Sequence, residues 1–379
     1  MKILVVGTYP FIHQGSMYRY DRMLLRGLEQ AGVEAQLIKP VPFFGRLRSS
    51  EAGTGKWLRY IDRFLLFPPL LRWHARGFDL VHIAAHGNAM YALMLGNKPN
   101  IVTCHDMLAI RSALGQVPEN PTRLMGRILQ RWALLGLKRA GYVVCDSEQT
   151  QREWLNIASP VHNGTSVVPI AFSYPYRPMG QAERNVRLDR LGLGDVHYIL
   201  HVGSNSWYKN RPGLARIFDA LIQHDAFRTF QLVITGKLLE TDVASWLQAH
   251  GHGSRLNQTG PVDNEDLRAL YSGARLLLFP SLQEGFGWPI VEAQACGCLV
   301  ATTNRAPMTE VGGQGAIYFD VSDAQGAAAT IAEAWGDRDI IIAQGTENAA
   351  RYSTEAMISG YRNAYQAVLS RNGRAESAR

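Results

Sequence analysis

The chain has 379 residues, of which 46% are hydrophobic and 19% charged, and this composition excludes an intrinsically disordered protein. Its length predicts two domains rather than one. The net charge of +7 is unevenly distributed, since residues 1–160 hold 20 Lys and Arg against 11 Asp and Glu. A basic first half suggests an anionic partner, namely a phospholipid, a nucleic acid or a phosphorylated acceptor, or else only a solvated surface.

The sequence shows none of the usual signs of export or membrane insertion. Residues 1–7 form an apolar strand and lack the regions of a signal peptide. The apolar run at Phe64–Trp73 is interrupted by Pro68, Pro69 and Arg72, and it is shorter than the ~20 residues that span a bilayer. The four cysteines show neither a disulfide framework nor zinc-ligand spacing. We therefore expect a cytoplasmic protein without a bound metal.

Short apolar strands alternate with helical patterns in both halves of the chain, which predicts parallel sheets covered by helices. The strands predicted in the first half are Ile3–Gly7, Ala35–Ile38, Leu80–Ile83, Ile101–Cys104, Tyr142–Cys145 and Ser166–Pro169. Those predicted in the second half are Tyr198–Val202, Gln231–Thr235, Leu276–Phe279, Leu299–Ala301 and Ala316–Phe319. Two such series predict an α/β protein with two doubly wound, Rossmann-like domains.

The segment Ala171–Asp195 is rich in Pro, Tyr, Gly and charged residues, which predicts a linker with a short helix. A further helix is predicted at Ser353–Ser370, with Ser353 and Thr354 as candidate caps. The expected organisation is an N-terminal domain at 1–175, a linker at 176–195, a C-terminal domain at 196–352, a helix at 353–370 and a flexible tail at 371–379.

Two segments of the first half interleave aromatic and basic side chains. They are Lys39–Arg76 and the helix predicted at Thr122–Arg139, in which Arg123, Arg127 and Arg131 recur every four residues. This pattern suits an anionic bilayer surface. A helix–helix core with solvated arginines explains it equally well.

Polar residues also follow a strand of the first half. His105 and Asp106 come directly after Ile101–Cys104, and residues just past the carboxyl end of a parallel strand face the ligand crevice. The plainer alternatives are a structural histidine and an aspartate that caps the next segment.

In the second half, Lys209 stands in a loop that opens a helix. Backbone N–H groups and a cation in that position together suit a diphosphate, although Lys209 can also be an ordinary surface lysine. Gly236 and Lys237 follow another strand and face the same crevice by topology, so Lys237 is a second candidate phosphate contact.

The most informative segment is 279–298, where an apolar strand, a glycine-rich turn and a helix follow one another. It places Glu284 and Glu292 eight positions apart, and carboxylates at such a junction suit the hydroxyls of a ribose or sugar rather than phosphates. Glu292 is predicted in the first turn of a helix starting at Pro289, where the helix dipole alone favours a carboxylate. Glu284 has no such capping explanation.

Taken together, these stretches resemble the retaining glycosyltransferases of family 4, which have the GT-B fold and use nucleotide-sugar donors. The similarity rests on five segments in order, namely 201–204 (His-Val-Gly-Ser), 207–210 (Trp-Tyr-Lys-Asn), 233–236 (Val-Ile-Thr-Gly), 260–274 and the Glu-x7-Glu segment. The resemblance implies two Rossmann-like domains facing a central cleft, with the C-terminal helix packing back toward the N-terminal domain.

The resemblance also implies roles for residues of the second half. Lys209 binds the donor pyrophosphate, Glu292 the ribose hydroxyls, and Glu284 the transferred sugar at the reacting centre. The remaining donor-binding residues that it implies are Gly203, Ser204, Gly236, Gly285, Phe286 and Gly287. The family often carries an arginine a few residues before the lysine, where this chain has 204–208 (Ser-Asn-Ser-Trp-Tyr), and Arg211 is the candidate replacement.

In the first half the similarity lies mainly in the layout. His105 matches a histidine that contacts the donor sugar, so Glu284 and His105 are the implied catalytic residues. Relatives carry a glycine pair before the first helix where this chain has Gly15 and Ser16; Gly15 is then a donor contact, and Ser16 and Asp106 are candidate acceptor contacts.

We therefore expect a retaining, metal-independent transfer of a hexosyl unit from GDP-mannose or a UDP-hexose to an acceptor hydroxyl. Acceptors implied by the resemblance are lipid-linked oligosaccharides and lipopolysaccharide or polysaccharide intermediates, at the inner face of the cell membrane. The alternatives are a nucleotide-sugar epimerase, a phosphorylase or an inactive nucleotide-sugar-binding scaffold. No recognition motif supports a nucleic-acid partner, despite the basic first half.

Overall fold

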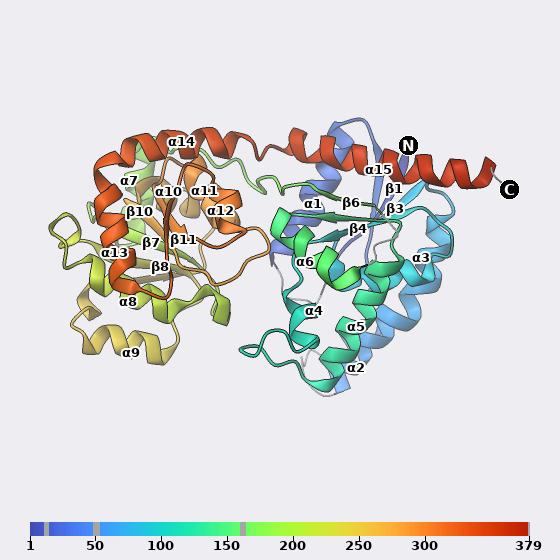
Figure 1. Ribbon diagram of the computed structural model, residues 1–379, viewed down its shortest axis with the longest axis horizontal. Coiled ribbons are helices and arrows are strands. Elements are labelled where there is room, and N and C mark those ends of the chain that lie inside the picture. Colours follow the sequence, from blue (N-terminus) through green and yellow to red (C-terminus); the bar gives the residue numbers. More distant parts are fainter. Residues whose placement is uncertain (11–14, 48–53, 160–163, 378–379) are drawn as a thin grey trace. The chain divides into compact units, whose positions relative to one another are not determined.

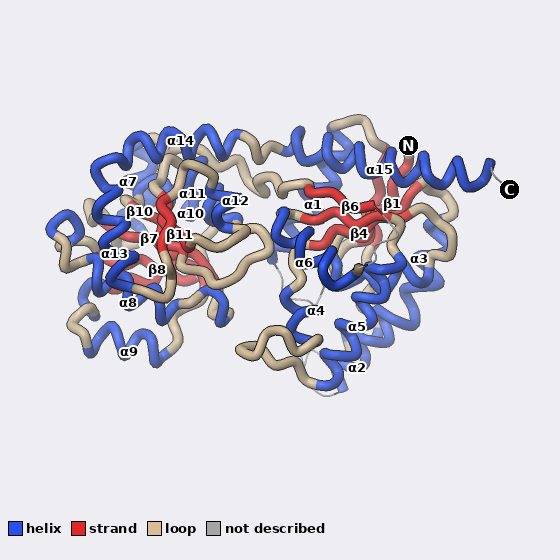
Figure 2. The backbone as a smooth tube through the Cα atoms, in the orientation of Figure 1, coloured by secondary structure: helices blue, strands red, loops and turns tan. Residues whose placement is uncertain are grey.

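The computed structural model describes residues 1–10, 15–47, 54–159 and 164–377. They form two compact units, each built on its own parallel sheet with helices on both faces (Figures 1 and 2). Unit 1 comprises Met1–Ser173 and Thr354–Arg379, and unit 2 comprises Tyr174–Ser353. The predicted α/β class, with two doubly wound sheets, is confirmed.

The sheet of unit 1 has the strand order β2-β1-β3-β4-β5-β6. Its strands are β1 (Lys2–Val6), β2 (Glu34–Ile38), β3 (Leu80–Ile83), β4 (Asn100–Cys104), β5 (Tyr142–Cys145) and β6 (Gly164–Val167). Most of their apolar residues are inaccessible to solvent, as expected for a parallel sheet covered on both faces. The chain reverses direction across the sheet between β1 and β3, which places a ligand crevice at the carboxyl ends of these strands.

The helices of unit 1 are α1 (Gly15–Gln30), α2 (Thr54–Ile61), α3 (Phe67–Ala75), α4 (Leu108–Ala113), α5 (Leu124–Arg139), α6 (Glu148–Ala158) and α15 (Thr354–Ser377). A π-helical turn at Asp62–Leu66 connects α2 to α3. Asp62 is buried there and accepts hydrogen bonds from Tyr9 Oη and from the backbone N–H groups of Phe44 and Gly45. The last two bonds tie together two parts of the basic–aromatic segment Lys39–Arg76.

The sheet of unit 2 has the order β12-β11-β10-β7-β8-β9, with the reversal between β7 and β10. Its strands are β7 (Tyr198–Gly203), β8 (Gln231–Gly236), β9 (Leu256–Gly260), β10 (Leu276–Phe279), β11 (Val300–Thr303) and β12 (Ile317–Phe319). Strand β9 is absent from the sequence prediction, because Leu-Asn-Gln-Thr-Gly lacks an apolar run. It is an edge strand, so it needs neither face fully apolar.

The helices of unit 2 are α7 (Gln181–Arg190), α8 (Arg211–Leu221), α9 (Thr241–Ala249), α10 (Asn264–Gly273), α11 (Trp288–Ala295), α12 (Met308–Gly312), α13 (Ala324–Glu333) and α14 (Arg338–Ala350). Helix α7 is the short helix predicted within the linker segment. A core of buried side chains from β7, β8, β10 and β11 packs against α8 and α13, and Phe218 and Phe227 are fully buried within it.

The C-terminal helix α15 packs against α1, β4 and β5 of unit 1, as the GT-B resemblance implies. Its attachment is polar as well as apolar. Tyr361 Oη lies 2.9 Å from Thr103 Oγ1, and Tyr365 Oη lies 2.8 Å from His82 Nδ1. Burial lowers the pKa of His82 to about 3, so its imidazole is neutral at physiological pH. The helix continues to Ser377, beyond the predicted end at Ser370.

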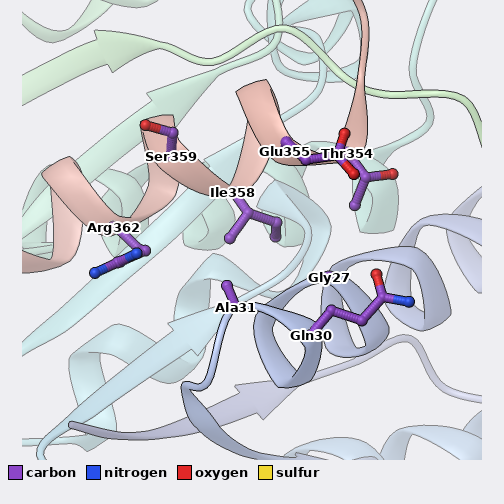
Figure 3. Close-up of a pocket in the computed structure, with 8 residues that line it drawn as sticks. All are labelled: Gly27, Gln30, Ala31, Thr354, Glu355, Ile358, Ser359 and Arg362. Atoms are coloured by element: carbon purple, nitrogen blue, oxygen red, sulfur yellow. The ribbon is translucent and has the colours of Figure 1, made fainter.

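A cavity of about 290 Å³ lies where the beginning of α15 meets the end of α1 (Figure 3). Ile358 projects from α15 toward α1, and a Cβ atom at Gly27 would lie 2.7 Å from the Ile358 side chain. Gly27 therefore permits the close approach of the two helices.

Candidate active site

The switch point of unit 2 brings two loops together, one after β7 and one after β10. Asn210 has a left-handed conformation with φ of 51°, caps α8 by accepting a hydrogen bond from Gly213 N, and donates from Nδ2 to Pro280 O at 3.2 Å. Leu282 N donates to Tyr208 O at 2.7 Å. These bonds join the loop that carries Lys209 to the loop that carries Glu284.

Lys209 and Glu284 form an ion pair across these two loops. Lys209 Nζ lies 2.7 Å from Glu284 Oε1, and the two side chains are only 11% and 10% exposed. The ammonium also lies 4.7 Å from the centroid of the Phe279 ring, within the range of a cation–π contact. The sequence predicted both residues as donor contacts, and the structure places them in direct contact with each other.

Glu292 lies on α11 and is 4% exposed. Its Oε2 accepts a hydrogen bond from Tyr271 Oη at 2.9 Å. The helix begins at Trp288, so Glu292 is its fifth residue, and the prediction that it lies in the first turn is wrong. The helix dipole acts mainly within the first turn and therefore does not explain this carboxylate.

Glycines shape the backbone around the pair. Gly287 has φ of 103° and is the N-cap of α11, and Gly236 has φ of 102°, both outside the range that other residues adopt readily. A Cβ atom at Gly236 would lie 2.4 Å from Gly203 O. Phe286 is 6% exposed and packs edge-on against Tyr352 at 5.4 Å, so its ring anchors the loop.

The other donor-site candidates of unit 2 differ in exposure. Arg211 is 2% exposed and donates to the carbonyl oxygens of Gly203, Lys237 and Leu238 at 2.7–3.0 Å. It therefore braces the loops after β7 and β8 from within. Lys237 has an exposed side chain, and Ser204 Oγ lies 3.0 Å from Ser206 Oγ.

In unit 1, His105 follows β4 as predicted, but it is 6% exposed and both ring nitrogens have partners. Nδ1 lies 2.5 Å from Asp146 Oδ2, and Nε2 lies 2.8 Å from Ala84 O. Burial opposes protonation, but the Asp146 carboxylate outweighs it, and the pKa of His105 is raised. Burial also raises the pKa of Asp146, while the neighbouring His105 imidazole opposes that shift.

The remaining candidates of unit 1 lie at helix starts. Asp106 Oδ1 accepts a hydrogen bond from Leu108 N at 2.9 Å, which is the capping alternative considered for it. Gly15 is the first residue of α1 and Ser16 the second. The preceding residues 11–14 lie outside the described part of the chain.

Two buried partners in these sites escaped sequence reasoning. Asp146 directly follows β5, so the argument that selected His105 could have found it as well. Tyr271 lies within 260–274, where only backbone contacts were considered, and no pattern in the sequence pairs it with Glu292. Among the residues that the structure describes, no group of three or more His, Cys, Asp or Glu side chains is placed to hold a metal, and no helix is long and apolar enough to cross a membrane.

Comparison with known proteins agrees with this architecture. Residues 19–168 match the family described as Glycosyltransferase Family 4, and residues 196–337 match the one described as Glycosyl transferases group 1. The O-antigen chain mannosyltransferase B of Escherichia coli is 28% identical over 348 residues, which cover 88% of each chain.

Two solved structures have the same fold. Sucrose-phosphate synthase from Thermosynechococcus elongatus superposes with a TM-score of 0.74 at 18% identity, covering 98% of this chain and all of the other. Anabaena HepE in complex with UDP gives a TM-score of 0.72 at 17% identity, covering 97% of this chain and all of the other.

Proposed function

This chain belongs to the glycosyltransferases of group 1 and family 4, and we propose that it transfers a hexosyl unit from a nucleotide sugar with retention at the anomeric carbon. The observation that carries the proposal is one cation and two carboxylates gathered around the switch point of unit 2. The proposed acceptor is a hydroxyl of a lipid-linked oligosaccharide or of a lipopolysaccharide or polysaccharide intermediate. GDP-mannose is the first donor to test, because a relative matched over 88% of each chain is a mannosyltransferase, and UDP-hexoses come next.

Each charged group has a distinct task in this proposal. Lys209 and the N-terminus of α8 neutralise the departing diphosphate, and stabilisation of developing charge is usually the largest catalytic contribution. Glu292, oriented by Tyr271, accepts hydrogen bonds from the ribose hydroxyls. Glu284 accepts hydrogen bonds from the transferred sugar and stabilises a transition state of oxocarbenium character. If the leaving phosphate takes the proton of the acceptor hydroxyl, the acceptor attacks the face of the sugar from which the phosphate departs, and the configuration is retained.

His105 is the proposed catalytic residue of unit 1, and it can be tested separately. Since the proposed nucleotide-binding groups lie in unit 2, His105→Gln should lower kcat and leave nucleotide affinity unchanged within about twofold. Kinetics and nucleotide titration on the same preparation measure both quantities. A parallel loss of nucleotide affinity would contradict this division of labour.

The donor and the stereochemistry can be tested in two steps. A thermal-shift panel of UDP, GDP, UDP-glucose and GDP-mannose identifies the nucleotide, since a ligand at 100 times its Kd stabilises a protein by about 2.7 kcal/mol. Transfer to a lipid-linked acceptor is then followed with the selected donor, with and without EDTA, and NMR of the product gives its anomeric configuration.

We expect the product to have the same anomeric configuration as the donor. We also expect EDTA to leave the rate of transfer unchanged. Inversion would remove the retaining assignment, and transfer that survives Glu284→Ala would remove that residue from the catalytic centre. Free sugar formed from the donor alone, or a requirement for inorganic phosphate, would instead point to an epimerase or a phosphorylase.

We also propose that unit 1 contacts an anionic membrane through what we term the basic–apolar surface. Its exposed apolar residues are Trp57, Leu65, Leu66, Leu70, Trp73, Leu124, Met125, Ile128 and Leu135. Its exposed basic residues are Lys56, Arg72, Arg76, Arg123, Arg127 and Arg131. The two segments pack together, since the Phe64 and Trp132 rings lie 5.1 Å apart.

Apolar side chains beside cations suit the boundary between lipid headgroups and acyl chains. The protein should therefore co-sediment with vesicles that contain anionic lipid at low salt, and less with purely zwitterionic vesicles. Replacement of both Trp73 and Leu124 by Ser should weaken binding, while Val186→Ser, an exposed apolar residue of unit 2, serves as the control. Equal sedimentation of all three proteins would refute the assignment of this surface.

A further inference from the structure

The contact between Lys209 and Glu284 has a consequence for the release of product. Both groups are about nine-tenths buried, and the ammonium contacts the carboxylate at 2.7 Å. The backbone bonds from Leu282 N to Tyr208 O and from Asn210 Nδ2 to Pro280 O hold their loops together. The pair is therefore a fixed feature of the free site rather than a chance encounter of two flexible side chains.

A diphosphate that approaches Lys209 must also approach Glu284. Because the carboxylate lies within hydrogen-bond distance of Nζ, any phosphate oxygen bound to that ammonium lies within a few ångströms of a second negative charge. Little water remains to screen the repulsion, since Glu284 is only 10% exposed. The same carboxylate is an acceptor for hydroxyl groups, and a nucleotide sugar carries such groups beside its diphosphate.

The free nucleoside diphosphate differs from the nucleotide sugar in two ways that act in the same direction. It carries one more negative charge on the terminal phosphate, and it lacks the sugar hydroxyls that would satisfy Glu284. The Glu284 carboxylate is therefore repelled by the product, whereas the substrate offers it hydrogen-bond donors.

We propose that Glu284 discriminates between the intact donor and the nucleoside diphosphate product by competing with that product for Lys209. This inference rests on the proposed function, in which Lys209 binds the diphosphate. After transfer, the Lys209–Glu284 pair re-forms and promotes departure of the nucleotide. Glu284 thereby determines the selectivity of the nucleotide site in addition to its contact with the sugar.

The test is isothermal titration of UDP and GDP, and of UDP-glucose and GDP-mannose, into the full-length wild-type protein and Glu284→Gln. The amide preserves the shape of the side chain and removes its charge. We expect Glu284→Gln to bind the free nucleoside diphosphate roughly tenfold more tightly than the wild type does, a change that corresponds to about 1.4 kcal/mol. Its affinity for the matching nucleotide sugar should rise much less or fall, so the preference for donor over product should decrease.

Two controls keep this result interpretable. Glu333→Gln removes an exposed carboxylate on α13 of the same unit and should leave both affinities unchanged. Glu284→Asp keeps the charge but shortens the side chain, so it should increase affinity for the nucleoside diphosphate less than the amide does. Thermal unfolding of each variant shows whether it is folded. If Glu284→Gln is not folded, the nucleotide affinities of Glu284→Asp provide the test.

An unchanged or weaker affinity for the nucleoside diphosphate in folded Glu284→Gln would overturn the inference and leave the proposed function intact. Failure of every protein to bind either nucleotide or either nucleotide sugar would instead overturn the proposed function, and this inference with it. Tighter nucleotide binding together with lost sugar transfer is the combined result that supports both.

Discussion

The two units place polar residues at the carboxyl ends of very similar sheets, but they use them differently. In unit 2 the principal charges lie on two loops and pair with each other, with 11% and 10% of their side chains exposed. In unit 1 His105 and Asp146 lie deeper, and both ring nitrogens of His105 already have partners within the unit. The charges of unit 2 are proposed ligand contacts, whereas in unit 1 the buried Asp146 holds the proposed catalytic residue His105 in place.

The largest expected effect tests the unit 1 side of this contrast. Asp146→Ala leaves His105 without its buried partner, and breaking a buried ion pair in this way costs about 3–5 kcal/mol of unfolding free energy. Urea denaturation measures the loss, with Glu29→Ala on the exposed face of α1 as a control expected to change stability by less than about 0.5 kcal/mol. Unchanged stability of Asp146→Ala would contradict a structural contribution of the His105–Asp146 pair.

The next effect tests unit 2. Lys209→Met removes the proposed diphosphate contact and should lower kcat by about 100-fold or more, equivalent to roughly 3 kcal/mol in activation free energy. Arg216→Met removes an exposed cation from α8 and should leave the rate unchanged. The two variants are compared by their initial rates of transfer with the identified donor. Similar rates for the two variants would contradict the proposed diphosphate contact and would leave the Lys209–Glu284 pair with a structural role only.

Backbone geometry gives a smaller effect. Gly236 has a φ of 102°, and the Cβ atom that Gly236→Ala adds would lie 2.4 Å from Gly203 O. The loop after β8 must therefore shift. Strain of this kind costs about 1–3 kcal/mol, and nucleotide affinity should fall with stability. Gly260→Ala is the matched control, because its φ of 68° is also left-handed but no atom lies within 4 Å of the added Cβ. The contrast fails if Gly260→Ala is equally damaging.

The smallest effect concerns pH and again separates the units. The raised pKa of His105 means that folded unit 1 retains a proton at pH values where the unfolded chain releases it. The free energy of unfolding should therefore be highest below about pH 6.5 and should fall as the pH rises toward 8, by at most about 1.4 kcal/mol per pH unit.

Asp146→Asn should reduce that slope, because it removes the carboxylate that raises the pKa of His105. Urea titrations of the two proteins at several pH values from 6 to 8 give the comparison. Parallel slopes would show that other groups are responsible for the pH dependence.

In both units, features with a local sequence signal were predictable and contacts between distant elements were not. The strands were predicted well wherever they lie inside a sheet, because burial on both faces leaves a continuous apolar run such as Leu276–Phe279. The edge strand β9 was missed because Leu-Asn-Gln-Thr-Gly carries no such run. The residues Lys209, Glu284 and Glu292 were predicted as site candidates because strand, turn and helix signals bracket them closely in sequence.

Partners that come from distant elements could not be found in that way. Tyr271 and Glu292 lie on different helices, and Asp146 meets His105 only because β4 and β5 pair in register, with Cys104 beside Cys145. The charge of Arg211 suggested a ligand contact, whereas its surroundings show a buried brace for two loops. In each case the type of side chain indicated a polar contact, and the neighbouring residues in the folded protein determined which contact it makes.

The sequence by itself determined the α/β class, the two parallel sheets and the family, because these depend on local apolar periodicity and on motifs with fixed spacing. The return of the C-terminal helix to unit 1 was implied by the family resemblance alone. Only the tertiary structure decided which charges neutralise one another. Electrostatic energy depends on distance and burial rather than on separation along the chain, and Lys209 is 75 positions away from the carboxylate that it contacts. That contact turns two separately predicted donor-binding residues into one coupled pair.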